Sequence, residues 1–150
     1  MAVRVQEDDF DVGVELAALT YGKTSVGGLG VFVGLVRDIH GGESVKALTL
    51  EHYPGMTEKK LEEIEAEARA RWPLDDTLIV HRVGRMEPGE NIVLVACTSA
   101  HREAALDATA FLIDWLKTKA PFWKYEETGS GDRWVDARES DDAAAARWNQ

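Results

Sequence analysis

Two stretches of the chain carry apolar residues three and four positions apart, the spacing that places side chains on one face of an amphipathic helix. The first stretch begins at Thr57, a residue type that favours helix N-termini, and ends at Pro73, which cannot continue a helix. Its predicted packing positions are Leu61, Ile64, Ala68 and Trp72. The opposite face is rich in Glu and Lys and is predicted to face solvent.

The second stretch is the longest predicted helix, from residue 100 to about residue 118, with Ser99 as its N-cap. Its predicted packing positions are Ala104, Ala105, Ala108, Phe111, Leu112, Trp115 and Leu116. A shorter helix, capped by Asp11, is predicted to end near Tyr21. The chain therefore has one short and two substantial predicted helices.

Between the helices, runs of β-branched and apolar residues predict strands. These runs cover residues 3–5, 27–36, 45–51, 77–83, 91–98 and 133–137. The run 27–36 is apolar at almost every position, which indicates a buried strand, and its glycines indicate close packing against another backbone. The run 45–51 is predicted to pair with it as a hairpin across a flexible loop at 40–44. Cys97 lies in the apolar run 91–98 and is predicted to be a small core residue.

This order of elements predicts a single α+β domain over residues 1–150, in which residues 141–150 form a frayed helix or a loose tail. No apolar run approaches ~18 residues, so no membrane span is predicted. The N-terminus has no hydrophobic signal core, and we expect a cytoplasmic protein. A net charge of −10 argues against a general nucleic-acid binder. The single cysteine excludes an internal disulfide and a cysteine-rich zinc cluster, and no metal or cofactor is expected.

Against this acidic background, one bend of the chain concentrates basic residues. Lys117, Lys119 and Lys124 surround the bend at Pro121, where the second long helix ends. Lysines near a helix C-terminus commonly serve only to complement the helix dipole. Lys124, however, lies beyond the helix and has no dipole to complement. A lysine whose charge is opposed by neighbouring amines can act as a nucleophile or a proton carrier, and both interpretations remain open.

Further basic residues lie where an anion would bind. His101 and Arg102 occupy the first turn of the second long helix, where backbone amides and the helix dipole favour a negative charge. Arg37 stands where the apolar run 27–36 ends in charged residues. We predict that these three residues converge with Lys117 and Lys124 in one pocket around an anionic ligand. The residue types alone do not identify the reaction.

Five segments of the sequence occur together in the order of a known family. They are FVGLVRD at 32–38, LEHYPGM at 50–56, HRVG at 81–84, SAHR at 99–102 and LKTKAPFWK at 116–124. In this order they resemble the large, catalytic subunit of molybdopterin synthase. The resemblance covers about residues 28–135, which is most of the chain.

The resemblance implies a sulfur transferase of molybdenum-cofactor biosynthesis. Members of the family convert cyclic pyranopterin monophosphate (precursor Z) into molybdopterin. The sulfur arrives as the C-terminal thiocarboxylate of a small ubiquitin-like subunit, whose tail enters the active site. Two large subunits form a central homodimer with one small subunit at each end, which makes a heterotetramer. The implied fold is of the α/β hammerhead type with an additional antiparallel β subdomain.

The resemblance also implies roles for individual residues. The catalytic lysines correspond to Lys117 and Lys124. The substrate-binding positions correspond to Leu35, Val36, Arg37, His101, Arg102, Lys117, Lys124, Tyr125 and Glu126. The chain departs from the family at Lys119, where arginine is frequent, and at Tyr125, where a basic residue is frequent.

Two alternatives to a synthase stay open from the sequence. One is a non-catalytic dimeric scaffold that binds a ubiquitin-like tail in a groove lined by Phe122 and Trp123, with the lysines gripping the terminal carboxylate. The other is an enzyme that uses the same basic cluster on a different phosphorylated metabolite. A carboxylate grip needs only one lysine, so the presence of both Lys117 and Lys124 favours the synthase over the scaffold.

Overall fold

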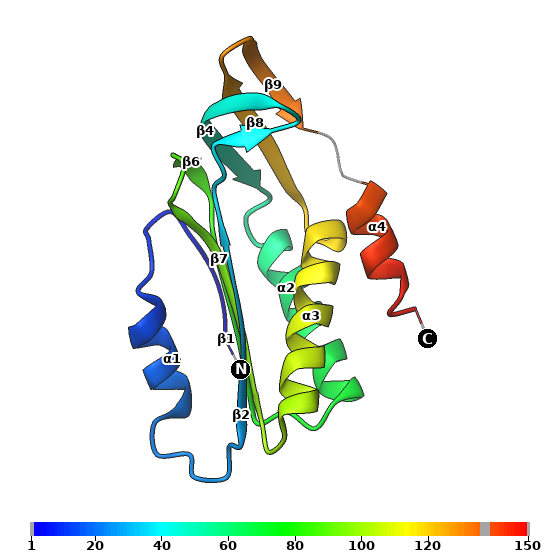
Figure 1. Ribbon diagram of the computed structural model, residues 1–150. Helices are drawn as coiled ribbons and strands as arrows, with labels where there is room; N and C mark the ends of the chain where they lie inside the picture. The colour runs from blue at the N-terminus through cyan, green and yellow to red at the C-terminus, as the bar shows by residue number, and fades with distance from the viewer. Residues whose placement is uncertain (1, 136–138, 150) are drawn as a thin grey trace.

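The computed structural model describes residues 2–135 and 139–149, which form a larger α/β body and a smaller β subdomain (Figure 1). The elements, in chain order, are β1 (Ala2–Gln6), α1 (Val12–Thr20), β2 (Gly28–Leu35), β3 (Ile39–His40), β4 (Glu43–His52), α2 (Met56–Arg71), β5 (Asp76–Arg82), β6 (Gly84–Met86), β7 (Asn91–Ser99), α3 (Arg102–Lys119), β8 (Phe122–Thr128), β9 (Gly131–Val135) and α4 (Glu139–Ala146). The α+β class predicted from the sequence is confirmed.

The body is built on a four-stranded sheet in the order β1-β5-β7-β2. β1 runs parallel to β5, and the other neighbours are antiparallel. Helices α2 and α3 cover one face of this sheet and α1 covers the other (Figure 1). Most of the packing positions predicted for α2 and α3 lie in the main core, where Leu61, Ile64, Phe111 and Leu112 are at most 2% exposed. Trp72 and Trp115 are partly buried against this core, and Ala104 and Ala105 are buried outside it.

The subdomain is an antiparallel sheet in the order β3-β4-β8-β9, with β6 paired to β4, and it lies at the top of Figure 1. Its first hairpin turns at Gly41 and Gly42, whose φ angles of 61° and 83° suit a two-residue turn between His40 and Glu43. The segment predicted to be a flexible loop is therefore a tight hairpin. The additional antiparallel subdomain implied by the resemblance is confirmed.

The predicted hairpin between the runs 27–36 and 45–51 is wrong. β2 pairs with β7, while β4 pairs with β3, β6 and β8 in the other sheet. The chain passes from one sheet to the other directly after β2, so sequence neighbours are not sheet neighbours here. β2 is consequently an edge strand with partly exposed apolar side chains, and the prediction that it is buried is also wrong.

Of the glycines within this strand, Gly30 packs closely against another backbone, as predicted, whereas Gly34 lies against the side chains of Val93 and Phe32. A Cβ atom on Gly30 would lie 2.4 Å from the backbone oxygen of Ala105, well inside van der Waals contact. Only glycine therefore lets α3 lie this close to β2. This close packing fixes the position of α3 along the strand that leads to Arg37.

Two predicted helix caps are replaced by other contacts. Ser99 ends β7, and its hydroxyl donates to the Pro73 carbonyl oxygen at 2.8 Å, so His101 is the N-cap of α3. Gly55, not Thr57, is the N-cap of α2. The prediction for Asp11 is confirmed, because its carboxylate accepts from the Val14 amide at 2.9 Å. None of the described helices is long and apolar enough to cross a membrane.

The C-terminal segment is helical and packed against the body. The side chain of Trp115 on α3 donates to the Ala145 carbonyl oxygen of α4 at 3.3 Å. The Trp148 ring lies 5.5 Å from that of Trp72 and 5.8 Å from that of Phe111. The final predicted strand appears as β9, and its last two predicted positions, 136 and 137, lie outside the described residues. Ala145 and Trp148 thus hold this segment to the same aromatic cluster that joins α2 to α3.

Candidate active site

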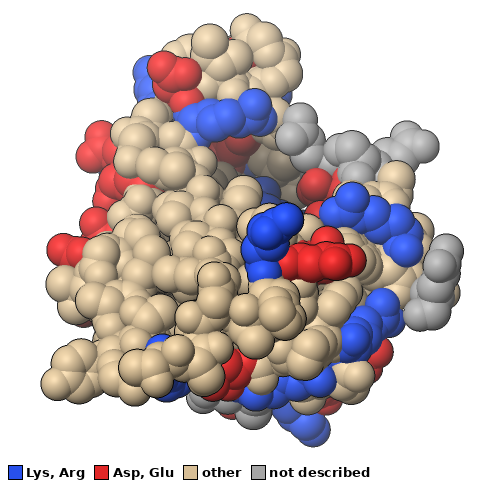
Figure 2. Space-filling model, turned by 60° about the horizontal axis from the view of Figure 1, so that its bottom comes forward, with Lys and Arg blue, Asp and Glu red and all other residues tan. Residues whose placement is uncertain are grey.

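A cavity of about 290 Å³ lies where the two sheets meet, beside the last turn of α3. We call it the junction pocket. Its lining residues are Leu35, Val36, Arg37, Ile39, His40, Val45, Leu48, Ile92, Lys117, Phe122, Lys124, Glu126, Val135 and Asp141. Figure 2 shows a hollow below the β subdomain that has both basic and acidic side chains around it. The volume is near the lower end of the range for small-molecule sites.

Three cationic side chains reach the junction pocket from three different elements. Arg37 follows β2, where the Val36 amide donates to the Glu90 carbonyl oxygen at 3.0 Å and holds the departing chain against the body. Lys117 comes from the last turn of α3, and Lys124 comes from β8. Three of the five basic residues predicted to converge therefore line one pocket.

Lys119 belongs to the same bend but not to the junction pocket. Its ammonium group lies 4.6 Å from the centre of the Trp115 ring, where it makes a cation–π contact. Positions 117 and 119 point in different directions because successive helical residues are turned by about 100°. The bend therefore supplies two lysines to the pocket and one to the surface.

Alternation along β8 decides which aromatic residues reach the pocket. Phe122, Lys124 and Glu126 face it, as positions two apart on a strand share one side. Trp123 faces the other way and lies 5.7 Å from the Tyr53 ring. The junction pocket is therefore not a groove lined by both Phe122 and Trp123, as the scaffold alternative required.

The same alternation corrects the assignment of Tyr125. Its ring packs edge-on against Trp134 at 5.1 Å, and its hydroxyl lies 3.4 Å from an Asp132 carboxylate oxygen, on the outer face of the subdomain. Lys124 and Tyr125 are adjacent on one strand, so they cannot both face one pocket. Tyr125 does not line the junction pocket.

Glu126 lies in the wall of the junction pocket and is only 6% exposed. Its carboxylate oxygens lie 2.7 and 2.9 Å from Nδ1 of His40, and Arg133 approaches the same carboxylate at 3.3 Å. Arg133 also reaches Glu43 at 3.4 Å. Glu126 is thus engaged by His40 and Arg133, which fix its position in the wall of the pocket.

Behind Phe122 lies a buried imidazole. The His81 ring stacks on the Phe122 ring, with centres 3.8 Å apart and planes 15° apart. Burial, and then the nearby charges of Lys117 and Lys124, lower the pKa of His81 to about 3, although the contact of its Nδ1 with the Arg82 carbonyl oxygen at 2.8 Å acts in the other direction. His81 is therefore neutral at physiological pH, and it supports one wall of the pocket without adding charge.

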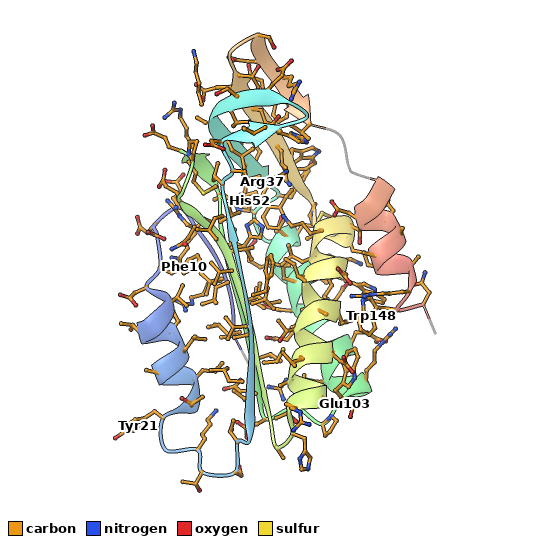
Figure 3. The ribbon with its side chains drawn as sticks, in the orientation of Figure 1. Phe10, Tyr21, Arg37, His52, Glu103 and Trp148 are labelled. Atoms are coloured by element: carbon orange, nitrogen blue, oxygen red, sulfur yellow. The ribbon has the colours of Figure 1, made fainter. Side chains whose placement is uncertain are left out.

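His101 and Arg102 do not line the junction pocket of their own chain, which corrects the prediction that all five basic residues converge. They lie at the opposite end of α3 from Lys117, about 22 Å away along the axis at 1.5 Å per residue. Figure 3 shows Glu103 at the lower end of α3 and Arg37 near its upper end. No single small ligand bound by one chain spans that separation.

Cys97 has the environment predicted from the sequence. It is fully buried in the main core, and burial raises the pKa of its thiol to about 11. A thiol in that state is a poor nucleophile, because the reactive form is the thiolate. The chain has no other cysteine, so it offers no sulfur nucleophile of its own.

Sequence reasoning missed His40 and Asp141, which both line the junction pocket, and His81 behind it. The available signal for His40 was the His-Gly-Gly-Glu sequence, which is typical of a tight hairpin that fixes its flanking side chains. No comparable local signal marks Asp141, whose contribution depends on how α4 packs against α3.

Comparison with known proteins agrees with this geometry. The family described as MoaE protein matches residues 5–119. The chain belongs to this family. It is 57% identical over 150 residues, all of both chains, to the molybdopterin synthase catalytic subunit of Pseudomonas aeruginosa. The resemblance seen in the sequence is thereby confirmed.

Solved structures of the family share the fold. A molybdopterin biosynthesis MoaE protein from Burkholderia ambifaria aligns with a TM-score of 0.85 and 55% identity, covering 100% of this chain and 99% of that one. A molybdopterin synthase from Staphylococcus aureus aligns with a TM-score of 0.81 and 32% identity, covering 89% of this chain and 96% of that one. These matches place both the body and the β subdomain within the family fold.

Proposed function

We propose that this protein is the catalytic subunit of a molybdopterin synthase. It transfers sulfur from the C-terminal thiocarboxylate of a small ubiquitin-like subunit to cyclic pyranopterin monophosphate, in the cytoplasm. The observation that carries the proposal is the convergence of Arg37, Lys117 and Lys124 in one pocket of an otherwise acidic chain. Family membership supplies the reaction class.

The charges of the junction pocket suit a phosphorylated substrate. Arg37 can contact a phosphate through two parallel hydrogen bonds, whereas each lysine acts as a compact positive charge. Glu126 is engaged by His40 and Arg133, so its negative charge does not repel the phosphate at full strength. The apolar wall of the pocket, including Phe122, suits the flat ring system of a pterin.

The buried cysteine explains why a partner is needed. Because Cys97 cannot present a thiolate, the sulfur has to arrive already activated on another molecule. A C-terminal thiocarboxylate meets this need, since its sulfur is a nucleophile and its acyl carbon can later release that sulfur. The pocket then has to orient the pterin, neutralise its phosphate and move protons.

His101 and Arg102 remain candidates for substrate binding only through a second copy of the chain. β2 is an edge strand that runs from Gly28, beside the Arg102 backbone, to Leu35 in the junction pocket. If two β2 strands pair antiparallel about a twofold axis, the start of each strand lies beside the end of the other. The second copy then brings its own His101 and Arg102 to the pocket of the first.

The surface of β2 suits such pairing. Leu29, Val31 and Phe32 are between 37% and 39% exposed, although they are large and apolar. Figure 2 shows a broad area without charged side chains on the face that it presents. An exposed apolar edge strand is a surface that proteins normally cover. We therefore place the homodimer interface of the proposed heterotetramer at β2.

The test of the proposed function is single-turnover conversion of cyclic pyranopterin monophosphate with saturating thiocarboxylated small subunit. In Lys117→Arg the side chain stays charged but can no longer give up a proton, because guanidinium is protonated at any working pH. We expect product formation to fall by about a hundredfold or more, the scale of losing a positioned acid–base group. Binding of the small subunit should change little.

Lys119→Arg is the matched control, because Lys119 belongs to the same bend but stacks on Trp115 outside the pocket. It should convert the pterin at a near-normal rate. Near-normal conversion by Lys117→Arg would reduce Lys117 to an electrostatic contact. If the unmodified protein forms no molybdopterin under these conditions, the proposed function itself is wrong.

A further inference from the structure

The wall of the junction pocket contains an imidazole–carboxylate pair that the reaction as described so far does not use. Nδ1 of His40 lies 2.7 Å from one carboxylate oxygen of Glu126 and 2.9 Å from the other. Both residues line the same pocket as Lys117. Glu126 is almost completely buried, so its carboxylate is fixed in place by its partners on neighbouring strands.

The partners of Glu126 determine which nitrogen of His40 carries a hydrogen. Arg133 donates to the Glu126 carboxylate at 3.3 Å, and a carboxylate only accepts hydrogen bonds. Nδ1 of His40 is therefore the protonated nitrogen. In the neutral imidazole the other nitrogen, Nε2, is then a hydrogen-bond and proton acceptor. Among the described residues, the hydrogen bonds of the His40 ring are those made by Nδ1.

The backbone around His40 gives the pair a fixed geometry. His40 and Glu43 are paired across the two-glycine turn, and Arg133 donates both to the His40 carbonyl oxygen and to Glu43, each at 3.4 Å. The ring is thus held by a hairpin, a buried carboxylate and a bridging arginine. This is the arrangement in which a carboxylate orients an imidazole that acts on protons.

The sulfur transfer contains one step that needs a base. Once the thiocarboxylate sulfur has displaced a leaving group from a carbon of the substrate, a thioester joins the small subunit to the pterin. A water molecule has to attack the acyl carbon. The new C–O bond forms and the acyl C–S bond breaks with its electron pair going to sulfur. Of the two protons of the water, one ends on the departing sulfur and the other in solvent. The products are a carboxylate on the small subunit and a thiol on the substrate.

On the basis of the proposed function, we propose that Nε2 of His40 accepts the proton of this water and that Glu126 holds the ring in position to do so. The proton passes from Nε2 to the departing sulfur or to solvent, which leaves the imidazole neutral for the next transfer. Lys117, which lines the same pocket, is placed to stabilise the negative charge that develops on the acyl oxygen. His40 then touches the reacting water, whereas Glu126 is a positioning residue.

The other ionisable groups around His40 are less suited to this role. They are Glu43, Glu126 and Arg133 in the subdomain, and Arg37, Lys117, Lys124 and Asp141 around the pocket. The lysines and arginines in their charged forms have no lone pair to accept a proton. Glu126 and Glu43 both accept hydrogen bonds from Arg133. Carboxylates are in general weaker bases than imidazole, since carboxylic acids lose their proton far more readily.

The experiment is single turnover of His40→Ala with thiocarboxylated small subunit and cyclic pyranopterin monophosphate, followed by rapid quenching and intact mass measurement. The adduct between the small subunit and the substrate should form at a rate within about twofold of normal. Its hydrolysis should slow by about a hundredfold, so that the adduct accumulates. Added imidazole should restore hydrolysis, because it can occupy the vacated space and accept the proton.

Two further variants separate positioning from surface charge. Glu126→Gln should slow hydrolysis by about tenfold, since an amide holds the imidazole less well than a carboxylate does. Glu127→Gln is the matched control, because Glu127 lies next on the same strand and pairs with Arg85 on the outer face at 2.9 Å. It should hydrolyse the adduct at the normal rate.

Three other outcomes would contradict either the proposed role of His40 or the proposed function of the protein. Normal adduct hydrolysis by His40→Ala would overturn the role of His40. Slow adduct formation together with slow hydrolysis and no response to imidazole would assign His40 and Glu126 a purely structural role. If the unmodified protein forms neither adduct nor product, the proposed function fails, which is a different result from either of these.

Discussion

The free energy of unfolding should depend on pH through His81. This imidazole is 3% exposed, and burial lowers its pKa from 6.5 to about 3 in the folded protein. Below pH 6.5 the unfolded chain therefore binds a proton that the folded chain does not. The contribution of His81 to stability is fully present above pH 6.5 and is lost progressively as the pH falls toward 3. Lys117, Lys124 and His52 lie nearby and oppose protonation of the folded form.

The size of the effect follows from the two pKa values. Proton linkage gives a loss of about 2 kcal/mol between pH 7.5 and pH 5.0, with a limiting slope of about 1.4 kcal/mol per pH unit. Because a pKa of about 3 lies well below pH 5.0, the folded imidazole stays neutral over this whole range. The range also stays above the sequence pI of about 4.8, where loss of net charge would promote precipitation.

Urea unfolding at one fixed protein concentration measures this loss for the unmodified chain, His81→Phe and His81→Gln. His81→Phe keeps a ring against Phe122, and His81→Gln keeps a donor for the Arg82 carbonyl oxygen. His81→Phe loses this hydrogen bond, which costs about 1 kcal/mol. The cost is the same at both pH values, so it does not affect the difference between them. Between pH 7.5 and pH 5.0, the free energy of unfolding of both variants should fall by about 2 kcal/mol less than that of the unmodified chain. An unchanged pH dependence in both variants would refute the reasoning.

Two other substitutions test packing and burial. Gly30→Ala should reduce the free energy of unfolding by about 1–3 kcal/mol, because the new Cβ would lie 2.4 Å from the Ala105 backbone oxygen. Gly129→Ala, where nothing lies within 4 Å of the new Cβ, should be close to neutral in the same urea titration. Glu65→Gln should stabilise the protein at neutral pH, because burial raises the pKa of Glu65 by disfavouring its charged form. The amide of Gln is uncharged at every pH and can still accept the hydrogen bond from the Thr77 hydroxyl. That gain should vanish as the pH falls through 4.5, and a gain that is constant with pH would exclude this explanation.

Local patterns in the sequence were sufficient for the helices and for part of the site. The spacing of Leu61, Ile64, Phe111 and Leu112 identifies the faces of α2 and α3 that are buried. Lys124 could be separated from the ordinary helix-terminal lysines because it lies beyond the proline that ends the helix. Both results depend on residues within a few positions of one another, which is the range over which backbone geometry is set by sequence.

The errors come from contacts between distant parts of the chain. Nothing near β2 in the sequence indicates that its partner is β7, about 60 residues later, because strand pairing is decided by the assembled sheet. His101 and Arg102 suit an anion by residue type, but the length of α3 puts them at its far end from Lys117. The position of Tyr125 could have been predicted, since adjacent residues on a strand face opposite sides.

The connection from α3 to β8 constrains which insertions and deletions the protein can accept. Because Phe122, Lys124 and Glu126 alternate with outward-facing residues, shifting β8 by one residue would turn Trp123 and Tyr125 inward and Lys124 outward. A shift by two residues would keep every face and move the ammonium group by about 7 Å along the strand. An insertion or deletion of an odd number of residues would therefore replace the charged side chains that line the pocket with aromatic ones. An even number would keep the charged side chains on the pocket side but move them along the strand. Natural variation in this segment should consequently preserve its length even where its residues differ.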